Sequence, residues 1–214
     1  MKCKKETMLL YAVTDRKWTG DMTLLEQVEA AIKGGATCIQ LREKELDKEA
    51  FLREAIEMKA LCSKYNVPFI INDHVEIAIK CGADGIHVGQ KDMEAGNVRA
   101  LVGEDMMIGV SVQTVEQALE AEKAGADYLG VGAVFTTTTK LDAHSVCHKT
   151  LKEICETTSI PVVAIGGINQ SNILELSGTG VDGVALVSAI FAVENIELEC
   201  ATLRALAKEM VQGK

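Results

Sequence analysis

One sequence plan recurs four times along the 214-residue chain and constrains the fold more than any other feature. Each copy has a glycine or other small residue, one or two further residues, and then a short apolar run. A stretch of helical periodicity, such as LLEQVEAAIK or TVEQALEAEK, precedes the run. The glycine is typical of a helix C-terminus that turns left-handed, and the apolar run suits a strand buried on both faces of a parallel sheet. The four copies are GGATCIQLRE (34–43), CGADGIHVGQ (81–90), AGADYLGVGA (124–133) and TGVDGVALVS (179–188).

Four further apolar runs lie between these copies. Pro68 and Pro161 stand at the openings of two of them, where a strand tolerates proline because no ladder donor is lost. The sequence therefore predicts eight strands, each followed by a helical pattern, with a last helix from about Glu194 to Met210. Eight such units predict a single (β/α)8 TIM barrel domain over residues 1–214, with parallel strands and an active site at their C-terminal ends. The four runs are MLLYAV (8–13), VPFIIND (67–73), MMIGVS (106–111) and IPVVAIGG (160–167).

An open, doubly wound sheet is the alternative architecture for alternating strands and helices. That fold normally carries a GxGxxG fingerprint after its first strand. Here the first strand ends AVTDRKWTG, which lacks the fingerprint. The barrel is therefore favoured.

Composition limits the classes of partner. A net charge of −9 argues against a general nucleic-acid binder, and no apolar run approaches the roughly 18 residues of a membrane span. The N-terminal segment reads as a first strand rather than an export signal. Seven cysteines without a CxxC pair fit reduced thiols in the cytoplasm better than a disulfide framework. The partners that we expect are therefore small-molecule substrates. The sequence does not fix the oligomeric state, and a homo-oligomer is one possibility.

Polar residues gather at the predicted C-terminal ends of the strands. Arg42, Lys44 and Lys140 would form a cationic rim, which an acidic protein needs if its ligand is an anion. Asp73 and Asp92 offer hard oxygen ligands that suit Mg²⁺. Magnesium beside such cations predicts a diphosphate site. Gly166 and Gly167 after strand 7, with Ser188 after strand 8, predict a second phosphate site of the kind found in barrels.

Each of these features also has a purely structural explanation. Residues 42–45 would serve equally as a solvated charged loop, and Asp73 as the cap of the helix beginning near Val75. Gly166 and Gly167 would equally form a tight turn. His87 alternates with apolar residues and fits a hydrogen-bonded core histidine better than a ligand. The functional interpretation rests on the conjunction of all the strand ends.

The chain resembles the thiamine phosphate synthase family over essentially its whole length. The resemblance rests on QLREK, IND, HVGQKD, GVS, TTTTKLDA, AIGGI and LVSAI, in that order. It implies a (β/α)8 barrel and a transferase that joins hydroxymethylpyrimidine diphosphate to thiazole phosphate, with release of pyrophosphate and a requirement for Mg²⁺. The implied metal ligands are Asp73 and Asp92.

The resemblance also implies which residues bind substrates. Arg42, Lys44, Ser111 and Lys140 would be the catalytic residues. The expected substrate-binding residues are Gln40, Leu41, Arg42, Glu43, Lys44, Asn72, Ser111, Thr137, Thr138, Thr139, Lys140, Gly167, Val187 and Ser188.

This chain departs from the family pattern at a few positions. Thr136 stands where proline is usual, GAVF replaces the frequent GPIF, and His74 replaces a common arginine. Three alternatives stay open: a thiazole tautomerase on the same barrel, a sugar-phosphate isomerase or aldolase, and a non-catalytic phosphate-binding barrel. The tautomerase would not need the metal carboxylates and the full cationic set. The isomerase or aldolase would leave the aspartate pair unexplained, and an inactive barrel would be expected to lose Lys140 or the aspartates.

Overall fold

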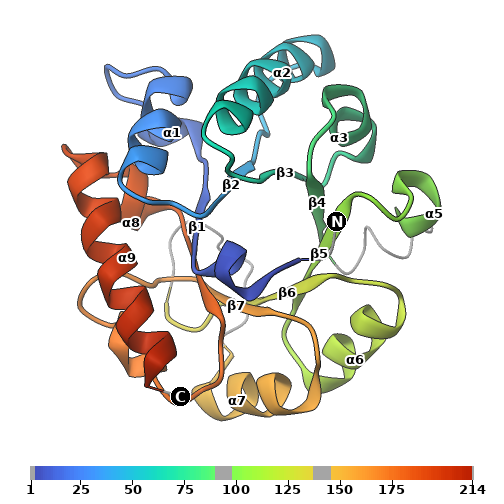
Figure 1. The fold of residues 1–214 in the computed structure, drawn as a ribbon, viewed down its shortest axis with the longest axis vertical. Helices are drawn as coiled ribbons and strands as arrows, with labels where there is room; N and C mark the ends of the chain where they lie inside the picture. Colours follow the sequence, from blue (N-terminus) through green and yellow to red (C-terminus); the bar gives the residue numbers. More distant parts are fainter. Residues whose placement is uncertain (1–2, 90–97, 137–145, 214) are drawn as a thin grey trace.

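The computed structural model describes residues 3–89, 98–136 and 146–213. Its centre is a closed barrel of eight parallel strands in sequence order, with β8 pairing back onto β1 (Figure 1). The predicted fold class is confirmed. The strands are β1 (Leu10–Val13), β2 (Cys38–Leu41), β3 (Phe69–Asn72), β4 (Gly85–Val88), β5 (Met107–Val112), β6 (Tyr128–Gly132), β7 (Val162–Ile165) and β8 (Gly183–Leu186).

Helices surround the barrel and link successive strands (Figure 1). None of the helices in the described ranges is both long enough and apolar enough to cross a membrane. The α-helices are α1 (Leu24–Lys33), α2 (Lys48–Lys64), α3 (Val75–Cys81), α5 (Val98–Val102), α6 (Val115–Lys123), α7 (His148–Thr157), α8 (Ser188–Phe191) and α9 (Ile196–Gln212). The 3₁₀ helices are η1 (Lys5–Met8), η2 (Arg16–Trp18) and η3 (Ile173–Leu176).

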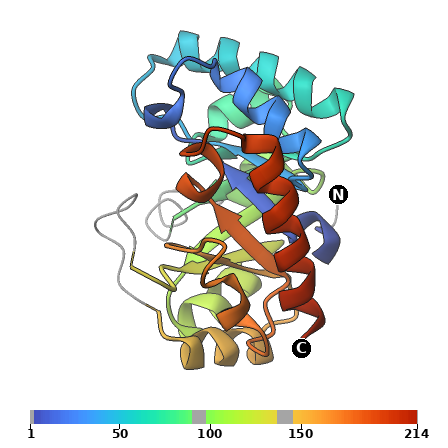
Figure 2. The same ribbon diagram turned by 90° about the vertical axis from the view of Figure 1, so that its left-hand side faces the viewer.

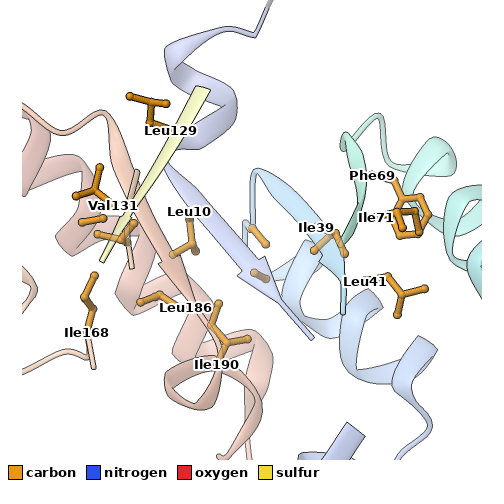
Figure 3. Close-up of a cluster of buried hydrophobic side chains, with 14 of the residues drawn as sticks. Leu10, Ile39, Leu41, Phe69, Ile71, Leu129, Val131, Ile168, Leu186 and Ile190 are labelled. Atoms are coloured by element: carbon orange, nitrogen blue, oxygen red, sulfur yellow. The ribbon is translucent and has the colours of Figure 1, made fainter. Parts of the chain in front are cut away.

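The strands are buried on both faces, as their apolar runs predict. Alternate residues point outward and pack between sheet and helices, among them Ile39, Phe69 and Leu129 (Figure 3). The other set, which includes Tyr11 and Tyr128, points into the barrel and forms a separate inner cluster. Two distinct cores follow from one period-2 pattern, because successive side chains of a strand point to opposite faces.

The recurring sequence plan has a precise structural meaning. Its glycines Gly35, Gly82, Gly125 and Gly180 all have positive φ, from +65° to +103°, which is the left-handed turn that the sequence predicts. Two residues later, a side-chain oxygen accepts the backbone N–H at or beside the start of the preceding strand in the barrel. The four bonds are Leu10 to Thr37 (2.9 Å), Phe69 to Asp84 (2.8 Å), Ile108 to Asp127 (2.8 Å) and Val162 to Asp182 (3.1 Å).

Each of the three aspartates in this plan is also paired with a cation. Lys59 lies 2.7 Å from Asp84, Arg99 lies 2.6 Å from Asp127, and Lys5 lies 3.0 Å from Asp182. The turn thus ties the beginning of one strand to the next unit, and the cation offsets the burial of the carboxylate. These contacts fix the N-terminal end of the barrel.

The N-terminal segment lies at that same end. η1 stands where the strands begin (Figure 2). Its Met8 is fully buried in the inner cluster. A Cβ on Gly183 would overlap the backbone carbonyl of Met8, so β8 needs glycine at this close approach. The opposite, C-terminal end of the barrel holds the predicted site residues.

One connection differs from the prediction of a helix after every strand. After β7 the chain forms only the four-residue 3₁₀ helix η3. The side-chain oxygens of Asn169 and Asn172 accept hydrogen bonds from nearby backbone N–H groups, at 2.9 and 2.8 Å. Such local bonds compete with those of a regular helix. Gly178 and Gly180, both at positive φ, end the segment soon afterwards.

Candidate active site

The parallel strands bring the predicted site residues of β2, β3 and β5 to one end of the barrel. Gln40 lies near the end of β2, Asn72 ends β3, and Ser111 lies near the end of β5. Gly167 follows β7 and Val187 follows β8, so they stand at the same end on neighbouring strands. The described residues do not include five of the predicted ones, so these stay predictions: Asp92, Thr137, Thr138, Thr139 and Lys140.

Leu41 and Glu43 differ from their neighbours in the predicted binding segment. Leu41 is fully buried and its side chain packs on the helix side of the sheet (Figure 3). Glu43 is 4% exposed, and its carboxylate is occupied by the protein itself. Any contact of these two residues with a ligand would therefore run through their backbone.

Glu43 organises the loop after β2. Its Oε1 accepts the backbone N–H groups of Lys44, Glu45 and Leu46, at 2.7, 2.6 and 3.3 Å. Burial would raise the pKa of Glu43, but these N–H groups and the Arg16 guanidinium outweigh it and hold the pKa below its usual range. Residues 42–45 are therefore an ordered turn, and the solvated-loop interpretation is wrong for Glu43.

The two cations of this loop differ in exposure. The Arg42 side chain is 22% exposed, and its Nη1 lies 3.9 Å from Asp15 Oδ2. The backbone N–H of Arg42 donates to Thr14 Oγ1 at 3.1 Å, which ties the loop to the end of β1. Lys44 is exposed. Arg42 thus stands in a held position and Lys44 in an open one, and both can offer positive charge to an anion.

Asp73 follows β3 in an unusual backbone conformation. Its φ is +62°, its backbone N–H donates to the His87 carbonyl at 2.8 Å, and Asn72 Nδ2 donates to its carboxylate at 2.6 Å. The N-cap residue of α3 is His74, which makes no side-chain capping bond. Asp73 is exposed, so its hard oxygen donors fit a divalent cation, and capping of α3 does not account for it.

A chain of hydrogen bonds crosses the barrel interior between two predicted substrate-binding residues, Gln40 and Ser111. It joins Gln40 Nε2 to Tyr11 Oη (2.7 Å), Tyr11 Oη to Tyr128 Oη (2.8 Å), Tyr128 Oη to His87 Nδ1 (3.0 Å), and His87 Nε2 to Ser111 Oγ (2.9 Å). His87 is therefore hydrogen-bonded through both ring nitrogens, as expected of a core histidine. Burial raises the pKa of Tyr11 and of Tyr128 well above the usual value, so both phenols stay protonated.

The glycines after β7 are required by the backbone. Gly166 and Gly167 have φ of +102° and +67°. A Cβ on Gly167 would lie 2.9 Å from Phe135 Cβ, and Asn172 Nδ2 donates to the Gly167 carbonyl at 3.0 Å. The tight-turn interpretation is thus confirmed, and it is compatible with a phosphate bound by the backbone at the same place.

Sequence reasoning missed Tyr11 and Tyr128, which lie inside the barrel beneath the site, and Arg16, which follows β1. Both tyrosines lie in runs that the sequence predicts as apolar strands. A signal did exist, because a buried tyrosine hydroxyl needs a partner, and Gln40, His87 and Ser111 are polar residues within other apolar strands. The position of Arg16 offered no such signal.

Comparison with known proteins gives one consistent result. The sequence profile of the family described as thiamine monophosphate synthase matches residues 10–190. The chain is 52% identical over 188 residues to a thiamine-phosphate synthase of Ruminiclostridium cellulolyticum, covering 88% of this chain and 90% of that protein. It is 48% identical over 200 residues to a thiamine-phosphate synthase of Clostridium tetani, covering 94% and 96%.

A solved structure gives the same result. The thiamine phosphate pyrophosphorylase from Pyrococcus furiosus superposes with a TM-score of 0.89 at 38% identity. The match covers 97% of this chain and 98% of that one. The similarity thus extends over the barrel and all of its described strand ends.

Proposed function

The chain belongs to the thiamine monophosphate synthase family, and from that premise we propose that it is a thiamine phosphate synthase joining hydroxymethylpyrimidine diphosphate to thiazole phosphate. The observation that carries the proposal is the assembly of Gln40, Arg42, Asn72 and Ser111 at the C-terminal end of a barrel that matches the family throughout. The products would be thiamine phosphate and pyrophosphate.

The diphosphate would bind beside β2 and β3. Arg42 and Lys44 supply positive charge there, and Asn72 supplies an amide donor. Lys140 is assigned to the same group by the family motif alone. Glu43 would contact the substrate only through its backbone. Its side chain holds the shape of the loop after β2.

Magnesium is the metal that the family resemblance implies. The exposed carboxylate of Asp73 fits it, and Asp92 is the second proposed ligand. When bound, Mg²⁺ neutralises negative charge on the diphosphate and makes it a better leaving group. The role of the protein is to hold that carboxylate: the Asn72 amide at 2.6 Å orients one of its oxygens.

The chemistry requires little more than charge neutralisation and positioning. The bond from the pyrimidine methylene carbon to the diphosphate oxygen breaks, and the diphosphate leaves with the electron pair. The resulting cation is stabilised by the ring amino group, and the thiazole nitrogen donates its lone pair to form the new C–N bond. Arg42, Lys44 and Lys140 would stabilise the developing negative charge. Holding the two reactants together lowers the remaining barrier.

The thiazole phosphate would bind on the other side, next to β7 and β8. Gly167 follows β7, and Val187 and Ser188 follow β8, which is the neighbouring strand in the barrel. The backbone of a glycine turn admits a phosphate closely because no side chain intervenes. Thr137, Thr138 and Thr139 are assigned to the same phosphate by their motif.

The partners that we propose are these two small molecules, and the proposed compartment is the cytoplasm. All seven cysteines are free thiols, which fits a reducing environment.

An endpoint assay with both substrates tests the function. With Mg²⁺ the wild-type protein should yield thiamine phosphate and pyrophosphate in equal amounts, and chelation of the metal should stop both. If the protein instead converts the thiazole phosphate alone and yields no joined product, it is a tautomerase on this barrel and the proposal fails. Cleavage or isomerisation of sugar phosphates by the same preparation would favour the aldolase or isomerase.

A further inference from the structure

The hydrogen-bond chain through the barrel carries an inference about how Ser111 meets its ligand. It links residues of five strands, from Gln40 on β2 to Ser111 on β5, and its central members are shielded from solvent: Tyr11 is 1% exposed and Tyr128 is fully buried. A buried chain of this kind has a direction, because each hydroxyl has one proton and each neutral imidazole has one N–H.

The direction follows from the end at Gln40. Its amide Nε2 donates to Tyr11 Oη, which leaves the proton of Tyr11 to be donated to Tyr128 Oη. The thiol of Cys38 also lies beside Tyr11, but sulfur is the weaker acceptor. Tyr128 then donates its own proton to His87 Nδ1, because the Tyr11 proton already occupies the contact between the two phenols and no other acceptor bonds Tyr128 Oη among the described residues.

The same reasoning continues through the imidazole. With Nδ1 acting as an acceptor, the neutral ring of His87 has its proton on Nε2, and that N–H donates to Ser111 Oγ at 2.9 Å. The oxygen of Ser111 is thereby an acceptor toward His87. Its own proton is directed to a different acceptor.

The interior of the barrel is built to admit this chain. Glycine within a strand weakens it and often marks a close approach. A Cβ on Gly109 would overlap the phenol ring of Tyr128 and come within 2.5 Å of His87 Nδ1. A Cβ on Gly130 would lie 3.0 Å from His87 Cε1. Gly109 lies on β5, between the strands of His87 and Tyr128, and Gly130 lies on β6 with Tyr128. The absence of side chains at these two positions leaves the space that the two rings occupy.

We propose that Tyr11, Tyr128 and His87 are positioning residues that hold His87 as the Nε2–H tautomer and so make the Ser111 hydroxyl a hydrogen-bond donor to the substrate. The substrate half of this inference rests on the proposed function. A group bound at Ser111 must then present a lone pair, as an aromatic ring nitrogen of an aminopyrimidine does, and a ring C–H at that place is disfavoured. This sets the specificity of the site for the heteroaromatic ring rather than for its diphosphate.

The first experiment reads the tautomer directly and needs no activity. Protein labelled with ¹⁵N in its four histidines is studied by long-range ¹H–¹⁵N NMR at pH 8, and His87→Gln identifies the His87 signals. The expected pattern is a neutral ring protonated at Nε2. In Tyr128→Phe, which lacks the donor to Nδ1, the pattern should shift toward the other tautomer. A wild-type neutral ring protonated at Nδ1 would overturn the proposal, because Ser111 would then donate to His87 Nε2. A cationic ring would also overturn it, because Nδ1 would then donate to Tyr128 and the tautomer would not be set by the Tyr128 proton.

The second experiment separates positioning from folding. Tyr128→Phe should raise KM for the pyrimidine diphosphate about tenfold, since one neutral hydrogen bond to the substrate is weakened, and should leave KM for the thiazole phosphate within about twofold. Tyr11→Phe should act in the same direction and serves if Tyr128→Phe does not fold. Tyr65→Phe is the matched control, because Tyr65 bonds Glu29 on the outside of the barrel at 2.6 Å, and it should change neither constant.

Equal losses for both substrates would show a merely structural role and would overturn the proposal. If the wild-type protein makes no thiamine phosphate at all, the proposed function fails. The NMR result then still decides the proton order on its own.

Discussion

Arg16 donates to one carboxylate oxygen of Glu43 from two guanidinium nitrogens, Nε at 2.9 Å and Nη2 at 2.7 Å. Arg16 Nη2 also lies 2.6 Å from Glu54 on α2, so one guanidinium joins the end of β1 to the loop after β2 and to α2. Glu43 lies in the segment that the family motif assigns to the substrate, yet its side chain is turned to the protein. Its negative charge would repel a diphosphate, and this arrangement neutralises it within the fold.

Replacement of Glu43 by Gln tests this structural role. The amide keeps one acceptor oxygen but places an NH₂ group against either the guanidinium of Arg16 or the backbone N–H groups of the loop. We expect KM for the pyrimidine diphosphate to rise by about tenfold, equivalent to about 1.4 kcal/mol. KM for the thiazole phosphate should stay unchanged. Steady-state kinetics with each substrate varied in turn measures both constants. Glu57→Gln, at an exposed position of α2, is the control and should behave as wild type.

The lowered pKa of Glu43 gives a second prediction, on stability against pH. Burial raises this pKa, but the N–H groups of the loop and Arg16 outweigh it and bring it below its usual 4.5. A group with a depressed folded-state pKa stabilises the fold above its unfolded-state pKa, and that contribution disappears as the pH falls through the folded-state value. Urea unfolding should therefore show wild type more stable than Glu43→Gln at pH 7, with the gap closing below about pH 4.5. A gap independent of pH between 7 and 3 would contradict the assignment.

Much of the fold could be predicted because its signals are local. The Gly-x-Asp and Gly-x-Thr turns, such as Gly82 to Asp84, combine a left-handed residue with a side-chain acceptor within three residues. Apolar periodicity then distinguishes strand from helix over short windows. The segment after β7 was harder, because the bonds of Asn169 and Asn172 to nearby backbone N–H groups override its apolar pattern.

The site could be predicted only in part, for reasons of distance in the chain. Residue types at strand ends indicate which groups gather there, so Gln40, Asn72 and Ser111 were found. The orientation of the Glu43 side chain depends on Arg16, which is 27 positions away in the chain. The contact of His87 with Ser111 depends in turn on Tyr128, which is 41 positions from His87. Such contacts are set by the closed barrel and have no local sequence signal.

Asp73 offers a direct test of the proposed metal site. Asn adopts positive φ at least as readily as Asp, so Asp73→Asn removes the charge while keeping the backbone at +62°. We expect the Mg²⁺ concentration for half-maximal activity to rise by at least about tenfold, because a hard cation loses an anionic ligand. A magnesium titration of the synthase reaction measures it. Asp105→Asn, at an exposed position at the opposite end of the barrel, is the control, and an unchanged titration in Asp73→Asn would exclude Asp73 as a ligand.

The strand-capping aspartates should contribute to stability rather than to catalysis. Asp127 accepts the N–H of Ile108 at 2.8 Å and a bond from Arg99 Nη2 at 2.6 Å. Its replacement by Ala leaves both donors without this partner, so the free energy of unfolding should fall by about 1–3 kcal/mol. Urea unfolding gives that value, and kcat at a temperature where the variant is folded should stay near wild type. Glu120→Ala on α6 should leave stability nearly unchanged.

Gly109→Ala should disturb the pyrimidine side of the site through the interior hydrogen-bond chain. The added methyl group would overlap Tyr128 and crowd His87, and the two rings are hydrogen-bonded to each other at 3.0 Å. We expect a loss of about 1–3 kcal/mol of stability from overpacking, together with a changed His87 tautomer signal and a raised KM for the pyrimidine diphosphate. Gly103→Ala is the matched control: its φ is +71° and nothing lies within 4 Å of the added carbon. The substitution adds backbone strain and no steric overlap, so the variant should lose stability. Its His87 signal and both KM values should stay as in wild type. If Gly109→Ala loses stability alone, in the manner of Gly103→Ala, the chain from Tyr128 to Ser111 does not position the substrate.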